Sequence, residues 1–135
     1  MPINPSILAR MRRIPETVQK AVTEQLAREG VDLVEAIKRA TPVDETGPHP
    51  GALRDGVHMR VNPNRAISFQ IISEGTDETG HVISSHVEFG HRTPEGGHVP
   101  ARPSFFPTYR ARRKGMARRL KAAARKALKE GLGAE

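Results

Sequence analysis

Apolar residues recur at helical spacing in two long stretches, one near each end of the chain. The first stretch starts at Pro15 and Glu16, where proline suits the first helical position and a carboxylate suits the first turn. It ends before Pro42, because proline disfavours helical backbone in the residue that precedes it. Its apolar face consists of Val18, Val22, Leu26, Leu33 and Ile37. This pattern predicts a long amphipathic helix, with a kink or a close neighbour at Gly30.

The second helical stretch runs from Phe106 to Lys129, with Gly131 as its predicted stop. Its apolar stripe is formed by Tyr109, Met116, Leu120, Ala124 and Leu128. Basic residues occupy most of the other positions. The sequence therefore predicts a long, strongly basic helix at the C-terminal end.

Strand-like alternation occupies the middle of the chain. Val57–Val61 and Ala66–Ser73 predict a hairpin across the turn-forming residues 62–65, with one helical turn at Ala52–Asp55 just before it. On the second strand Ile67, Phe69 and Ile71 share one face. The segment His81–Phe89 predicts a third strand, with Val87 and Phe89 on one face and Glu88 on the other. The expected fold class is α+β: a long N-terminal helix, an antiparallel β meander of about three strands, and a long basic C-terminal helix packed on the sheet.

Length and composition favour a single small domain. The 135 residues suit one domain, 1–135, with an irregular N-terminal arm at 1–13 and a C-terminal tail at 129–135. Only 4% of the residues are aromatic and 36% are hydrophobic, so we expect a modest core whose stability depends on partners. No apolar run is long enough for a signal peptide or a membrane span, which predicts a soluble protein without a membrane partner. The absence of Cys excludes disulfides and thiol chemistry.

The positive charge is concentrated in one element. Residues 101–135 hold 11 of the 22 Lys and Arg and two of the 15 acids, a net charge of +9, whereas residues 1–100 sum to −2. Candidate contacts to an anionic partner are Arg112, Arg113, Lys114, Arg118, Arg119, Arg125 and Lys126. A solvated helix face, an acidic protein partner and non-specific contact with nucleic acid explain such a run equally well.

The sequence predicts no catalytic, metal-binding or cofactor-binding residues, and hence not an enzyme. His86, His91 and His98 are separated by five and seven residues, which matches no zinc-ligand spacing. An acid/base pair of His86 or His91 with Glu88 would need a defined pocket and a second oriented group. The run PEGGH lacks the spacing of a phosphate-binding loop.

Three segments, in order, carry a resemblance to a known family. The segments AIKRATPVDETG with GALRDGV, SSHVEFGHR, and PARPSFFPTYRARR resemble the signature of a tail-completion and head-tail joining (neck) family of long-tailed bacteriophages. The family is named after the tenth gene product of phage HK ninety-seven. The resemblance covers residues 14–128. The chain departs from the family pattern by an extra Glu45, by a longer link before Leu53, and by His91 in place of threonine.

The resemblance implies a structural protein that joins head and tail as a ring of identical copies. It would bind itself and other neck, connector or tail proteins, in the host cytoplasm during assembly and at the head-tail junction of the virion. Phe105 and Phe106, framed by prolines, would form a stiff anchor, although one of the two could simply cap the core. The expected interface residues are Arg92, Thr93, Pro94, His98, Val99, Arg102, Phe105 and Phe106. The alternatives are a tail-terminator ring subunit at the end of the tail tube, and a basic protein that binds DNA non-specifically through its C-terminal helix.

Overall fold

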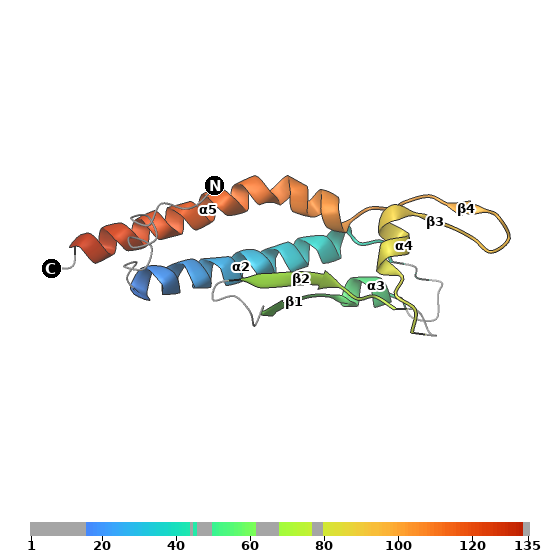
Figure 1. Ribbon diagram of the computed structural model, residues 1–135, viewed down its shortest axis with the longest axis horizontal. Helices are drawn as coiled ribbons and strands as arrows, with labels where there is room; N and C mark the ends of the chain where they lie inside the picture. Colours follow the sequence, from blue (N-terminus) through green and yellow to red (C-terminus); the bar gives the residue numbers. More distant parts are fainter. Residues whose placement is uncertain (1–15, 44, 46–49, 62–67, 77–79, 134–135) are drawn as a thin grey trace, which may run out of the picture.

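The protein is an elongated α+β molecule in which two long helices lie over a small β hairpin (Figure 1). The computed structural model describes residues 16–43, 45, 50–61, 68–76 and 80–133, and the side chains of these up to residue 130. Helix α2 lies between α5 on one side and the strands β1 and β2 on the other, and α2 and α5 run antiparallel. The predicted fold class is confirmed, with fewer strands in the central sheet than expected. The predicted arm at 1–13 lies outside the described residues.

Helix α2 spans Glu16–Ala40 and matches the prediction at both ends. It is closed at its C-terminal end by Thr41, whose backbone N–H and hydroxyl both donate to the carbonyl of Ile37, at 2.9 and 2.7 Å. These bonds satisfy a carbonyl that has no partner within the helix, and Pro42 then prevents further extension. Gly30 does have a close neighbour, because a Cβ at this position would overlap the sulfur of Met59. The missing side chain thus lets the helix sit directly on β1.

The hairpin forms as predicted, but the third strand does not. After the short helix α3 (Ala52–Asp55), β1 (Val57–Val61) pairs antiparallel with β2 (Phe69–Ser73), Val57 opposite Ser73. The predicted turn at 62–65 and Ile67 lie outside the described residues. The prediction of a strand over His81–Phe89 is wrong, since this segment forms only a bridge between Thr76 and Val82 and then helix α4, Ser84–Phe89.

Helix α4 places an acidic residue inside and an aromatic residue outside. Glu88 is buried and Phe89 is 68% exposed. The Ser84 hydroxyl donates to the Ser73 carbonyl at 3.0 Å, which ties the start of α4 to the end of β2. As described below, the helix places the Glu88 carboxylate against the backbone amides at the start of α5. Two short strands, β3 (His91–Arg92) and β4 (His98–Val99), then form a separate small hairpin.

Helix α5 spans Phe105–Gly133, so it starts one residue earlier than predicted and passes through Gly131 instead of stopping there. The buried cluster consists of Leu33, Val34, Ile37 and Val57, with Met59, Ile71, Phe105 and Met116 packed against it. Met116 therefore lies in the predicted apolar stripe as expected. Tyr109 and Leu128 are 41% and 43% exposed, while Ala127 is buried. The packed face of α5 is therefore rotated from the predicted one and includes Ala127 in place of Tyr109 and Leu128.

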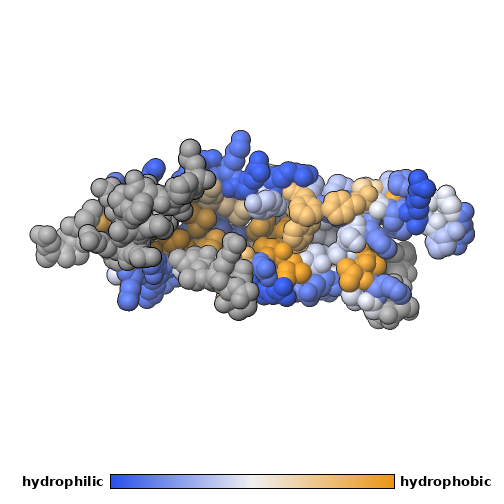
Figure 2. Space-filling model, viewed as in Figure 1, coloured by the Kyte–Doolittle hydropathy of each residue, from blue (hydrophilic) through white to orange (hydrophobic). Residues whose placement is uncertain are grey.

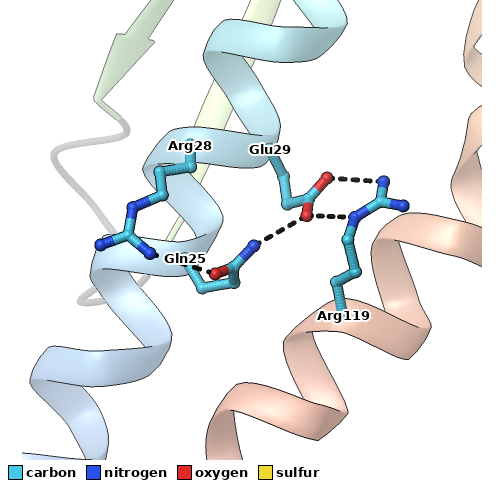
Figure 3. A network of polar contacts seen from close by, with 4 residues as sticks. All are labelled: Gln25, Arg28, Glu29 and Arg119. Carbon is cyan, nitrogen blue, oxygen red and sulfur yellow. Dashed lines mark hydrogen bonds and ion pairs between the residues drawn. The ribbon is translucent and has the colours of Figure 1, made fainter.

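A buried carboxylate fixes α5 against α2 (Figure 3). The side chain of Glu29 is 4% exposed, and Arg119 donates to it twice, from Nε to Oε1 at 2.5 Å and from Nη2 to Oε2 at 2.8 Å. Gln25 donates a further hydrogen bond to Oε1 at 2.8 Å. The hydrogen bond from Arg119 holds the pKa of Glu29 below its ordinary value of 4.5, and burial opposes this effect. Such a forked pair specifies both the register and the rotation of the two helices.

The Glu29 carboxylate should make the stability of the fold depend on pH. A lowered pKa in the folded state means that the contribution is present above pH 4.5 and is lost as pH falls through the folded value. We expect Glu29→Gln to lower the free energy of unfolding by about 2 kcal/mol at neutral pH. The difference from wild type should shrink in acid, as measured by urea unfolding across pH. Glu35→Gln, exposed on the same helix, should change stability by less than about 0.5 kcal/mol. A difference that stays constant with pH would contradict this account.

Candidate functional site

The N-terminus of α5 is held by the carboxylate of Glu88, which belongs to α4. Oε2 accepts hydrogen bonds from the backbone N–H groups of Ser104 at 2.8 Å and Phe105 at 3.0 Å, and Oε1 accepts one from Phe106 at 3.0 Å. The first amides of a helix have no partner inside it, and the positive end of the helix dipole favours a negative charge. Glu88 is only 8% exposed, so water does not compete strongly for these bonds. One side chain thereby links α4 to α5.

Backbone contacts hold the two ends of the segment between α4 and α5 close together. The Arg102 N–H donates to the Val87 carbonyl at 2.7 Å. Gly90 has φ 76° and ψ 169°, a conformation that is essentially restricted to glycine. A Cβ at Gly90 would lie 2.8 Å from the carbonyl oxygen of Val99 and 2.9 Å from the nitrogen of Ala101. Within the sequence Val-Glu-Phe-Gly, Glu88 therefore caps α5, and Gly90 allows the two chain segments to pass close to each other.

The β3–β4 hairpin forms a projecting arm beyond the end of the helical layer (Figure 1). We use the name arm for residues 91–103. Its tip is closed by Thr93, which exchanges backbone hydrogen bonds with Gly96 and Gly97 and accepts a third from the Gly97 N–H on its hydroxyl at 2.9 Å. Thr93 is thus a structural residue of the turn. The other expected interface residues of the arm are exposed: Arg92, Pro94, His98, Val99 and Arg102.

The two phenylalanines at the start of α5 have different roles. Phe105 packs against the buried cluster. This is the core-capping role that was expected for one of the two phenylalanines. Phe106 is 43% exposed, and its ring centroid lies 5.9 Å from that of Phe89, which is more exposed still. We call Phe89 and Phe106 the aromatic patch. Phe89 was not among the expected interface residues, because the sequence placed it in a third strand.

The aromatic patch borders an apolar cleft of about 300 Å³ at the foot of the arm. The cleft reaches the core through Phe105 and Ile37, and its polar wall includes Ser84 and Glu88. Residues of α2, α3, β1, β2, α4 and α5 line it. An open apolar cleft beside exposed aromatic rings is the type of surface that accepts an anchor from a partner.

The histidines form no metal centre in the part of the chain that the structure describes, where no group of three potential ligands occurs. The rings of His86 and His91 stack with centroids 4.9 Å apart. His58 lies 3.6 Å from a carboxylate oxygen of Glu74, an exposed pair. Nothing in these contacts orients a base toward a nucleophile, so they indicate packing at the foot of the arm and at the hairpin.

The basic residues of α5 separate into two faces. Arg112, Arg119 and Lys126 recur every seven residues on the face toward α2, where Arg119 pairs with Glu29 and Arg112 adds an attractive charge near it. Lys126 lines a shallow depression between the two helices together with Arg119. The remaining seven cations are exposed, and Lys129 among them lies beside Glu130 near the end of α5. We call the other six the outer face: Arg110, Arg113, Lys114, Arg118, Lys121 and Arg125.

Comparison of the chain with protein-family models, with curated proteins and with solved structures finds no match. The family resemblance of the three sequence segments therefore stays a hypothesis. None of the described helices is long and apolar enough to cross a membrane.

Because Glu88 caps α5, removing its carboxylate should lower the stability of the fold. Glu88→Ala leaves three buried or half-buried amides without their acceptor, so we expect the free energy of unfolding to fall by about 2 kcal/mol. Glu95→Ala, at the exposed tip of the arm, is the matched control and should be neutral within about 0.5 kcal/mol. Chemical denaturation followed by circular dichroism measures both. Equal stability of the two variants would contradict the capping role.

The close passage at Gly90 predicts that alanine is poorly tolerated there. Gly90→Ala adds both backbone strain and a clash with the returning chain. Gly96→Ala is the matched control, because Gly96 also has a positive φ of 87° but has open space around its missing Cβ. We expect Gly96→Ala to cost about 1 kcal/mol and Gly90→Ala at least about 2 kcal/mol more, in the same denaturation assay. Equal costs would show that the contact with Val99 and Ala101 imposes no constraint.

Proposed function

We propose that this protein is a structural, non-enzymatic subunit of a tailed-phage neck that joins heads to tails as a ring of identical copies. The proposal rests first on the three ordered sequence segments that resemble the head-tail joining family. In the fold the second and third segments are in contact, since Glu88 of the second caps the helix that begins in the third. A tail-terminator ring subunit would use the same contacts at a different position in the particle.

The observation that carries the proposal is the exposed aromatic patch at the foot of the arm. Large aromatic side chains dominate the energy of many protein interfaces, and exposed apolar patches mark interaction sites. Phe89 and Phe106 are held by the capped start of α5 and by α4, so docking costs them little conformational freedom. A free basic DNA-binding protein, the alternative of a different class, needs only α5 and gives this patch no role.

A ring explains why the arm and the patch occur together. In a head-to-tail ring each subunit presents one surface to the neighbour ahead and a different surface to the neighbour behind. The arm, residues 91–103, extends past the body and can contact the next subunit or the next neck layer. The patch and its cleft supply the complementary apolar surface. The small buried cluster of the subunit agrees with stability gained on assembly.

The test is replacement of the aromatic patch in a phage that encodes the protein. Phe89→Ser with Phe106→Ser should leave a folded subunit, because both side chains are exposed, but should yield separate heads and tails in electron micrographs. A loss of about 2 kcal/mol or more for each interface anchor would reduce joined particles by tenfold or more. The control is Val31→Ser, which removes an apolar side chain of 52% exposure on α2.

Two results would overturn the proposal. The first is a normal yield of joined particles from the doubly substituted phage. The second is a neck reconstruction in which the chain is absent or occurs as a single copy with its arm in solvent. A ring found at the end of the tail tube would instead support the tail-terminator alternative.

A further inference from the structure

The outer face of α5 is a continuous row of cations without any acidic neighbour on the same helix stretch. Its six residues occur between positions 110 and 125, and no Asp or Glu lies in this interval. At a rise of about 1.5 Å per residue, the row is roughly 22 Å long. Figure 2 shows hydrophilic residues along the edge of α5 that faces away from α2. Arg119 is bound to Glu29, whereas all six residues of the outer face are exposed.

The composition of the outer face favours a phosphate backbone over a protein partner. Protein interfaces usually have an apolar centre from which charged residues are depleted, whereas protein–DNA interfaces are polar and strongly positive. Between Arg110 and Arg125 the side chains on this face other than the cations are alanines. Among the described side chains of α5, the exposed large apolar residues lie near its two ends, at Phe106, Tyr109 and Leu128. No apolar centre is therefore available for a protein partner.

The spacing and type of the cations also suit a polyphosphate. Duplex DNA carries one phosphate per about 3.4 Å along each strand, so a row of roughly 22 Å runs beside about six phosphates. Four of the six residues are arginines, which bind phosphate oxygens in a forked geometry. The face has no Asn or Gln, which read adenine in the major groove, and no aromatic ring to stack on an unpaired base.

We infer that the outer face of α5 binds the sugar-phosphate backbone of duplex DNA without sequence preference. The binding is electrostatic and is driven by release of counterions from the phosphates. It uses Arg110, Arg113, Lys114, Arg118, Lys121 and Arg125, and leaves the three cations toward α2 in their structural positions. This inference does not rest on the proposed neck function, because it concerns a different surface from the aromatic patch.

The experiment measures binding of the full-length protein to two duplexes of unrelated sequence by fluorescence anisotropy, from about 50 to about 200 mM salt. The outer-face variant carries Arg110→Gln, Lys114→Gln, Lys121→Gln and Arg125→Gln. The matched control carries Lys20→Gln, Arg39→Gln, Arg54→Gln and Arg60→Gln, and so loses the same charge from exposed positions outside α5. Glutamine is a good helix former, and circular dichroism checks that both variants are folded.

The wild-type protein is expected to bind both duplexes equally and to lose affinity steeply as salt rises. The outer-face variant should bind at least about tenfold more weakly at low salt. Its slope of log affinity against log salt should be smaller by about 0.9 for each phosphate that the variant no longer neutralises. The control should stay within about threefold of wild type.

Three outcomes would overturn the inference. Equal weakening in both variants would show that only net charge matters. A wild-type affinity that does not depend on salt would exclude binding to phosphates. Binding of poly-L-glutamate as tightly as duplex DNA at the same salt, with weaker binding by the outer-face variant, would assign the face to an acidic protein partner. Each of these results leaves the test of the aromatic patch unaffected.

Discussion

The carboxylate of Glu88 is the contact on which the geometry of the candidate site depends. It accepts three backbone hydrogen bonds at the start of α5, from a residue on a helix of only six residues. Because the carboxylate is buried, breaking these bonds would leave helix amides unpaired in a site with little access to water. The cap thus fixes α4 relative to α5, and the arm leaves and re-enters the body between these two elements. The aromatic patch has one ring from each of them, so the same contact also sets its shape.

A second constraint, the pair of Glu29 and Arg119, fixes the rotation of α5 about its own axis. Since Arg112 and Lys126 are seven residues from Arg119 on either side, all three cations turn toward α2 together. The other cations must then point outward. One buried acid on α2 therefore decides which basic residues of α5 support the fold and which face solvent.

The sequence predicts the elements governed by local periodicity and misses those governed by distant partners. Both long helices and the β1–β2 hairpin follow from spacing that is visible within each segment. Helix α4 does not, because its helical state satisfies amides 16 to 18 residues further along the chain, and alternation around Glu88 is typical of a strand. Glu29 did leave a signal. It falls between Leu26 and Leu33 on the apolar face of α2, where an acid is unexpected unless it has a partner.

The two surfaces of the molecule differ in the physics by which they would act. An apolar patch with little conformational freedom favours a partner of fixed shape, and its contribution changes little with ionic strength. A row of exposed cations attracts a polyanion over a distance of about one Debye length and weakens as salt rises. The patch lies at the foot of the arm, whereas the row extends along α5 away from it. Because no side chain belongs to both surfaces, substitutions on one leave the residues of the other unchanged.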